Sequence, residues 1–348
     1  MVEVGKNQTP SDSNNVRWES SADTMTEQPL NEPVLGYSPG SPERNSIIQE
    51  IDRQMSETIE IPCIINGEEV YTGHTIPQVI PHNHGHILAN VHLAGREEME
   101  SACSAAVNAQ RSWIEIGLEE RCKIFEKCAD LLAGDWRMRV NASTMLNQSK
   151  TVFQAEIDSA CELIDFWRFN CHYARGFHDD FQPLVSPEGV VNSTDIRPLE
   201  GFVLSITPFN FTSIAGNLPS APAIVGCTSV WKPSRNSYYS NYYLMRLMME
   251  AGLPPGVINF LPGSGAEITE VALSNPNFAG LHFTGSTATF QGLWQEIGLA
   301  LPKLNSYPRI VGETGGKDFV VAHPDCDRRG LVVALLRGAF EYQGQKCS

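Results

Sequence analysis

Long apolar runs and basic residues are both scarce in this sequence of 348 residues. No apolar run reaches eighteen residues, so the sequence predicts no helix that crosses a bilayer and no membrane partner. Lys and Arg number 25 against 40 Asp and Glu, and the net charge of −15 opposes binding to the phosphates of nucleic acids. We therefore expect a small molecule as the partner.

Cysteine pairs and metal-ligand clusters are also missing. The nine cysteines are odd in number and form no Cys-x-x-Cys pair, which predicts free thiols in a reducing compartment. His82, His84 and His86 alternate and would share one face of a strand. No carboxylate or Cys stands near them at ligand spacing, so a loop with exposed imidazoles is favoured and no metal is assigned.

The chain divides by composition into an arm, a β-rich part and a helical layer. Residues 1–44 are rich in Ser, Asn, Pro and Glu, which predicts a mobile acidic arm. Residues 61–92 have a strand pattern with an Asn66-Gly67 hairpin turn. Residues 96–175 follow the 3.6-residue period of three or four helices. The length and an apolar content of 42% predict about two domains.

From Gly201 onward, short apolar strands alternate with helices, which predicts an α/β fold with a parallel sheet. Ligands bind such sheets at the carboxyl ends of the strands. A complete G-x-G-x-x-G fingerprint is absent, because Ile268 stands where the third glycine would follow Gly263 and Gly265. A tight turn before a helix is therefore the favoured interpretation of these two glycines. The expected strands are 201–207, 228–231, 257–261 and 280–283.

The predicted strand ends carry polar motifs. Gly285 and Ser286 offer a close backbone approach, a hydroxyl and a helix start, which suit a pyrophosphate, and Lys232 could hydrogen-bond ribose hydroxyls. Two later motifs are ambiguous when taken singly. Glu313 in Glu-Thr-Gly-Gly-Lys could be a solvated turn carboxylate, and Cys347 in Gly-Gln-Lys-Cys could be a buried helix residue.

Taken in order, Asn-Phe after a strand, Trp-Lys-Pro-Ser, Phe-Thr-Gly-Ser, Glu-Thr-Gly-Gly-Lys and Gly-Gln-Lys-Cys resemble the aldehyde dehydrogenase superfamily from about Glu60 to Ser348. The resemblance implies an aldehyde dehydrogenase fold with a Rossmann-like parallel NAD-binding domain and an N-terminal helical layer. We expect the arm at 1–44, the NAD-binding domain at 45–305 with the helical layer at 96–175, and only the start of a catalytic domain at 306–348.

A second set of segments resembles the branch of this superfamily that oxidises L-glutamate γ-semialdehyde to L-glutamate in proline breakdown. The resemblance implies an NAD-dependent enzyme, a homo-oligomeric full-length form and, in eukaryotes, the mitochondrial matrix. The acidic N-terminus does not match a transit peptide, so a cytoplasmic location stays open. The segments are Asn31–Leu35, Gly40–Arg44, Asn83–His86, Gln154–Asp158, Glu162–Phe166, Arg168–Asn170 and Phe340–Tyr342.

The resemblance also implies roles for single residues. Cys347 matches the nucleophile, Asn210 the side-chain donor to the oxyanion, and Glu313 the base that activates water against the thioester. Glu162 matches the carboxylate that faces the substrate ammonium, although it could be a structural helix residue. Further matches near the substrate are Phe211 and Ser348, and those around the dinucleotide are Thr207, Phe209, Lys232, Ser234, Gly285, Ser286, Thr287, Ala288 and Thr289.

Two features leave alternatives open. Arg235 stands where the superfamily often has an acid, and it could accept a 2′-phosphate or point to water, so NADP stays possible beside NAD. The family's catalytic domain continues well past the cysteine, so we expect that this chain is truncated. The alternatives to the semialdehyde oxidation are therefore an inactive dinucleotide-binding fragment, and an aldehyde dehydrogenase for another semialdehyde such as succinic semialdehyde.

Overall fold

The computed structural model describes residues 28–183 and 185–346. A seven-stranded sheet in the order β10-β9-β6-β7-β8-β2-β3 forms its centre. The first five strands in that order are mutually parallel, which confirms the predicted α/β class with a parallel sheet. These strands are β6 (Phe202–Ile206), β7 (Thr228–Lys232), β8 (Ile258–Phe260), β9 (Phe278–Thr284) and β10 (Arg309–Glu313).

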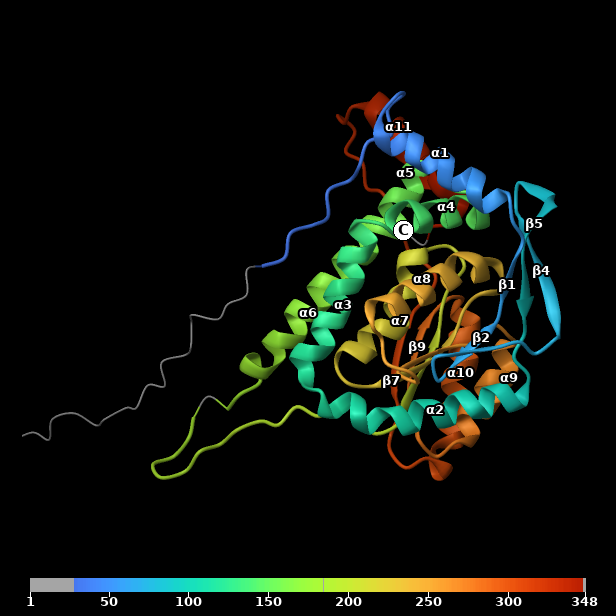
Figure 1. Cartoon of the computed structure of the whole chain (residues 1–348). Helices are drawn as coiled ribbons and strands as arrows, with labels where there is room; N and C mark the ends of the chain where they lie inside the picture. Colours follow the sequence, from blue (N-terminus) through green and yellow to red (C-terminus); the bar gives the residue numbers. More distant parts are fainter. Residues whose placement is uncertain (1–27, 184, 347–348) are drawn as a thin grey trace, which may run out of the picture.

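Helices cover both faces of this sheet (Figure 1). One face packs against α7 (Thr212–Ile224) and α8 (Tyr238–Ala251), because apolar residues of both elements meet there. The other face packs against α2 (Arg96–Glu115), α9 (Gly265–Ser274) and α10 (Thr287–Ala300). The helices α3 (Gly117–Ala133) and α6 (Glu162–Asp180) run side by side as an outer layer over α7.

The strands that pair antiparallel lie earlier in the chain than the strands of the parallel part, and β2 and β3 join the edge of the same sheet. The predicted turn joins β2 (Cys63–Ile65) to β3 (Glu68–Val70), and Asn66 and Gly67 there have the positive φ values of 52° and 78° that such a turn requires. A separate three-stranded sheet contains β1 (Ile59–Ile61), β5 (Asn83–His92) and β4 (Thr75–Ile80).

The histidine stretch lies at the start of β5, where His82 and His84 are exposed. The Nδ1 atom of His82 lies 2.8 Å from the hydroxyl of Ser149. Among residues 28–183 and 185–346, no three His, Cys, Asp or Glu side chains are grouped as metal ligands. In the same part of the chain, no helix combines the length and the apolar character that crossing a membrane requires.

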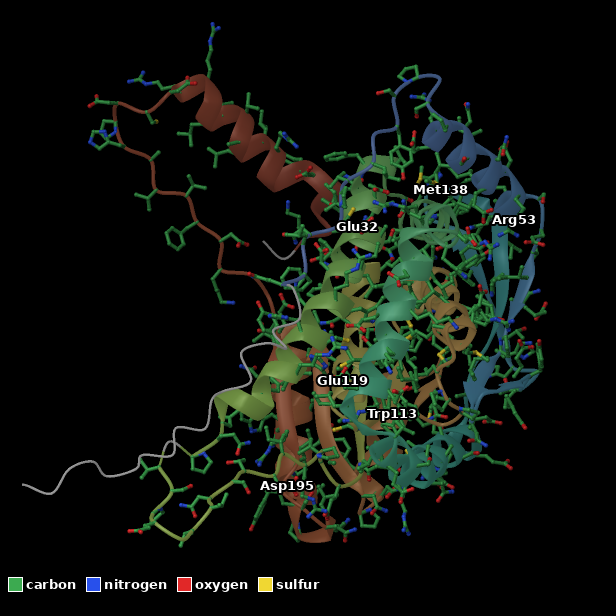
Figure 2. All side chains as sticks on the ribbon, turned by 60° about the vertical axis from the view of Figure 1, so that its left-hand side comes forward. Glu32, Arg53, Trp113, Glu119, Met138 and Asp195 are labelled. Carbon is green, nitrogen blue, oxygen red and sulfur yellow. The ribbon has the colours of Figure 1, made fainter. Side chains whose placement is uncertain are left out.

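The prediction of a mobile arm as far as residue 44 is wrong for residues 28–44; residues 1–27 lie outside the described part. The carboxylate of Glu32 accepts hydrogen bonds from Arg137 at 2.6 Å and from Arg168 at 2.7 Å, and the hydroxyl of Tyr37 donates to Glu156 at 2.7 Å. Figure 2 shows Glu32 against the helical body. Composition could not reveal this contact, because the partners lie about a hundred residues further along the chain. The segment leads into α1 (Pro42–Met55).

A π-helical segment, which the sequence analysis did not predict, interrupts the helical layer. After α4 (Arg137–Gln148) and α5 (Val152–Ala155), residues Glu156–Cys161 form this segment and run directly into α6. Such one-turn insertions change which side chains face inward and are frequent at functional sites. Here the segment carries Asp158, which is fully buried.

Candidate active site

The carboxyl ends of β6, β7, β9 and β10 border a cavity of about 380 Å³. This is the edge of the sheet at which parallel strands offer a ligand site. The fold brings together here residues that the sequence predicted from separate motifs: Thr207, Phe209, Asn210, Ser234, Gly285, Ser286, Thr289 and Glu313.

The start of α10 forms one wall of this cavity. Ser286 is the N-cap residue, and its Oγ accepts from the backbone N–H of Thr289 at 3.2 Å. Gly285 donates its N–H to the carbonyl of Glu313 at 3.1 Å, and a Cβ on Gly285 would lie 2.7 Å from the ring of Phe283. The glycine is therefore required by packing, and the helix N-terminus with two hydroxyls suits an anionic group.

Three predicted cofactor residues lie beside this cavity without lining it. Thr287 and Ala288 are exposed in the first turn of α10. The ammonium end of Lys232 lies beside Gly265, and burial lowers the pKa of its amine. Arg235 is exposed at the start of a short 3₁₀ turn, Arg235–Ser237.

A second and larger cavity of about 910 Å³ also borders the ends of β9 and β10, and the predicted substrate residues Glu162 and Phe211 line it. Glu313 lines both cavities. Asn210 faces the smaller cavity and Phe211, its neighbour in the chain, faces the larger one. The predicted oxyanion donor and base thus lie where the two cavities meet.

Glu162 is a perturbed carboxyl group at the start of α6. Burial raises its pKa to about 7; the neighbouring charges of Asp158 and Glu313 act in the same direction. The hydroxyl of Ser213, which donates to Glu162 at 2.7 Å, and the charge of Lys150 partly oppose this effect. Perturbed groups in a cleft are candidates for functional sites, which favours the functional reading of Glu162 over the structural one.

The segment before Cys347 closes over the site. The side-chain amide of Asn210 donates to the carbonyl of Gln345 at 3.2 Å, and Gln345 precedes Cys347 by two residues in the sequence. The ring of Phe211 stacks on that of Tyr342 at a centroid distance of 5.5 Å. Cys347 and Ser348 themselves lie outside the described residues, so their roles stay predictions.

Two groups of site residues escaped the sequence analysis. Asn31, Glu32 and Val34 line the larger cavity, although the composition of their segment predicted a mobile arm. Lys150 and Asp158 form a buried ion pair with 2.5 Å between Nζ and Oδ2, directly behind Asn210 and Phe211. Only long-range packing reveals that Lys150 belongs to the site, since its own stretch of sequence carries no chemical motif.

The fold and the strand-end residues define an aldehyde dehydrogenase architecture, and comparison with known proteins agrees. The model of the aldehyde dehydrogenase family matches residues 70–348, so the chain belongs to this family. Among its relatives, the delta-1-pyrroline-5-carboxylate dehydrogenase of Agaricus bisporus is 49% identical over 319 residues, which is 91% of this chain and 58% of that protein. The human mitochondrial enzyme of the same name is 42% identical over 333 residues, 96% of this chain and 58% of that protein.

Solved structures give the same result. The delta-pyrroline-5-carboxylate dehydrogenase from Mycobacterium tuberculosis bound with NAD has a TM-score of 0.91 and 51% identity, covering 93% of this chain and 61% of that one. The 1-pyrroline-5-carboxylate dehydrogenase from Thermus with bound NAD has a TM-score of 0.84 and 27% identity, covering 93% and 62%. The chain spans about 58% of the length of the curated relatives that it matches.

Proposed function

We propose that the protein oxidises L-glutamate γ-semialdehyde to L-glutamate with NAD. The observation that carries this proposal is the junction of the two cavities, where Glu313 lines both and the neighbours Asn210 and Phe211 face one each. A dinucleotide on one side and an aldehyde on the other would meet at this junction. The names of the relatives support the choice of substrate.

The smaller cavity has the donor set that a dinucleotide needs. The first turn of α10, with the hydroxyls of Ser286 and Thr289, suits the pyrophosphate. We assign the ribose hydroxyls to Lys232, which lies beside Gly265 and does not line the cavity. When bound, NAD supplies the acceptor for a hydride from the substrate. The protein's own residues supply the nucleophile, the oxyanion donor and the base.

In this proposal the thiolate of Cys347 adds to the aldehyde carbon, a C–S bond forms, and the carbonyl electron pair moves to oxygen. The side-chain amide of Asn210 donates a hydrogen bond to that oxygen. After oxidation to the thioester, Glu313 takes a proton from a water molecule that attacks the carbonyl carbon, and the thiolate leaves. Glu162, on the substrate side, offers a carboxylate to the α-ammonium group.

The test is NADH formation with glutamate γ-semialdehyde, measured for the wild type and for Cys347→Ala. We expect the variant to lose turnover and to keep NAD binding, because Cys347 forms the covalent bond and does not belong to the predicted dinucleotide residues. Succinic semialdehyde serves as the competing substrate. A higher kcat/KM for succinic semialdehyde would overturn the substrate assignment, and NAD binding without any turnover would reduce the function of this chain to cofactor binding.

Arg235 tests the choice of cofactor. An exposed guanidinium at this position could accept the 2′-phosphate of NADP, whereas NAD has a hydroxyl there. Arg235→Asp should therefore weaken NADP binding selectively, as measured by the quenching of protein fluorescence with each cofactor. An equal loss for NAD and NADP would refute a role in cofactor choice.

We further propose a location in the mitochondrial matrix and a homo-oligomeric assembly for the protein. The first is supported by the mitochondrial relatives in animals, fungi and Dictyostelium. Imaging of a fluorescent fusion of the full protein tests the location, and light scattering after size-exclusion chromatography tests the assembly. A diffuse cytoplasmic signal or a monomeric mass would contradict the respective proposal.

A further inference from the structure

We propose that the buried Lys150–Asp158 ion pair is the positioning device of the candidate active site, which holds Asn210, Phe211 and Glu162 in register with one another. This inference rests on the proposed function. It assigns a role to two side chains that neither touch the substrate cavity nor belong to the predicted chemistry. The contacts of each partner carry it in turn.

Lys150 holds the oxyanion side of the site. Ser149 ends α4 in a left-handed conformation with φ of 56°, and the chain then places Lys150 inside the protein with no exposed side-chain area. Its Nζ donates to the backbone carbonyl of Asn210. The same ammonium lies 4.5 Å from the ring centre of Phe211 and 4.9 Å from that of Tyr342, within cation–π range.

Asp158 holds the substrate side. Its carboxylate accepts from the backbone N–H groups of Thr212 and Ser213 at 3.4 and 3.3 Å, and these groups begin α7. The hydroxyl of Ser213, which donates to Glu162 at 2.7 Å, also lies 3.1 Å from the carboxylate of Asp158. A carboxylate at a helix start satisfies N–H groups that have no partner within the helix. One ion pair therefore fixes the loop before α7, the start of α7 and the carboxyl group of Glu162.

The loop that contains Asn210 and Phe211 needs rigid positioning if Asn210 is to act in catalysis. Misplacing a catalytic group by about 1 Å lowers the rate by about 10²-fold. The backbone of Asn210 and Phe211 lies in a short loop between β6 and α7, which regular hydrogen bonding does not fix. A buried pair is rigid, because neither charge can be left alone in the interior without a large penalty.

The decisive experiment is a double-mutant cycle on kcat with Lys150→Met and Asn210→Ala, in the form of the protein that turns over glutamate semialdehyde. Asn210→Ala alone should lower kcat by about 10²–10³-fold, and Lys150→Met alone by about 10²-fold. If Lys150 acts by positioning Asn210, Lys150→Met should have little further effect in the Asn210→Ala background. Effects that multiply would overturn the inference, since they would mean that Lys150 acts on kcat independently of Asn210.

Arg121→Met is the matched control. Arg121 is a buried cation of α3 that contacts the C-terminal end of α7, and it lines neither cavity in the described structure. The substitution should lower thermal stability and leave kcat and KM unchanged.

If Lys150→Met does not fold, Ser213→Ala keeps the ion pair and cuts only its link to Glu162. That variant should raise KM for the semialdehyde without a change in kcat, and an unchanged KM would refute the substrate arm of the proposal. Failure of the proposed function has a different signature, namely a wild type without semialdehyde oxidation.

Discussion

The two ends of α7 each contact a buried cation, but the cations differ in their partners. At the N-terminal end, Lys150 pairs with Asp158, whose carboxylate accepts from the first N–H groups of the helix. At the C-terminal end, the guanidinium of Arg121 donates to the carbonyl of Ile224 at 3.0 Å. It also donates to the carbonyls of Trp113 and Ile114 at 3.3 Å each.

The comparison shows that the two ends of α7 have similar capping contacts and differ in whether they adjoin the candidate site. Both ends follow the same electrostatic rule, with an acid at the helix start and a cation at the helix end, so both satisfy polar groups that the helix leaves open. Only the N-terminal end adjoins the two cavities, through Asn210, Phe211 and Glu162. The contacts at the C-terminal end join α7 to α2 and α3. Substitutions at the first end should therefore change stability and catalysis together, and those at the second end stability alone.

The largest effect on stability is expected from Asp158→Asn. This change leaves the ammonium of Lys150 buried without a counter-charge, and breaking a buried pair in this way costs about 3–5 kcal/mol. Urea denaturation of the wild type and the variant measures the difference in the free energy of unfolding. A loss below about 1 kcal/mol, the value for an exposed pair, would mean that Lys150 has an alternative partner and that the two ends differ less than the structure indicates.

Arg121→Met should have a smaller effect. The carbonyls of Ile224, Trp113 and Ile114 would lose a donor in the interior, and an unsatisfied buried acceptor costs about 1–3 kcal/mol. The Trp113 indole still donates to the carbonyl of Ala223 at 2.8 Å, so the end of α7 keeps one cap. Thermal unfolding followed by circular dichroism measures the loss. A drop in kcat in this variant would break the comparison, because it would show that the C-terminal end also reaches the site.

Much of the parallel sheet could be predicted from the sequence, because its information is local. Apolar runs of strand length, each followed by a helical period, specify the order of elements, and the rule for parallel sheets then places the strand ends at one edge. Ser286 begins a helix as predicted, since an N-cap residue acts through its own backbone. The proposed dinucleotide side of the site follows from motifs of this kind.

The substrate side depends on contacts that no local pattern encodes. Glu32 hydrogen-bonds to Arg137 and Arg168, which lie more than a hundred residues further along the chain. The composition of its segment predicted a mobile arm, because composition carries no information about such distant partners. Lys150 and Asp158 are only eight residues apart, but the loop before α7 and the start of α7, which they contact, lie some fifty to sixty residues further on. The π-helical turn that contains Asp158 has no propensity signal. The resemblance to a family predicted Glu162 and Phe211 as substrate residues. Their contacts with Ser213 and Lys150 could be identified only in the three-dimensional structure.

The N-terminal end of α7 should also show a pH dependence, which Glu162 adds. Its pKa is raised from 4.5 to about 7, so the folded protein binds a proton that the unfolded chain releases between these values. The contribution of Glu162 to stability is therefore full below about pH 4.5 and is lost as the pH rises through about 7, with a slope of at most about 1.4 kcal/mol per pH unit. Urea denaturation across this window should show a shallower fall for Glu162→Gln than for the wild type.

The same titration should act in the opposite direction on substrate binding. If Glu162 binds the ammonium group of the proposed semialdehyde substrate, its carboxylate attracts that group and its neutral form does not, so KM should fall as the pH rises through about 7. Glu162→Gln should remove this dependence and keep KM high throughout, while Arg121→Met should retain the wild-type profile. If Glu162→Gln kept the wild-type KM profile, another group would govern the titration, and the N-terminal end of α7 would organise the oxyanion donor without selecting the substrate's charge.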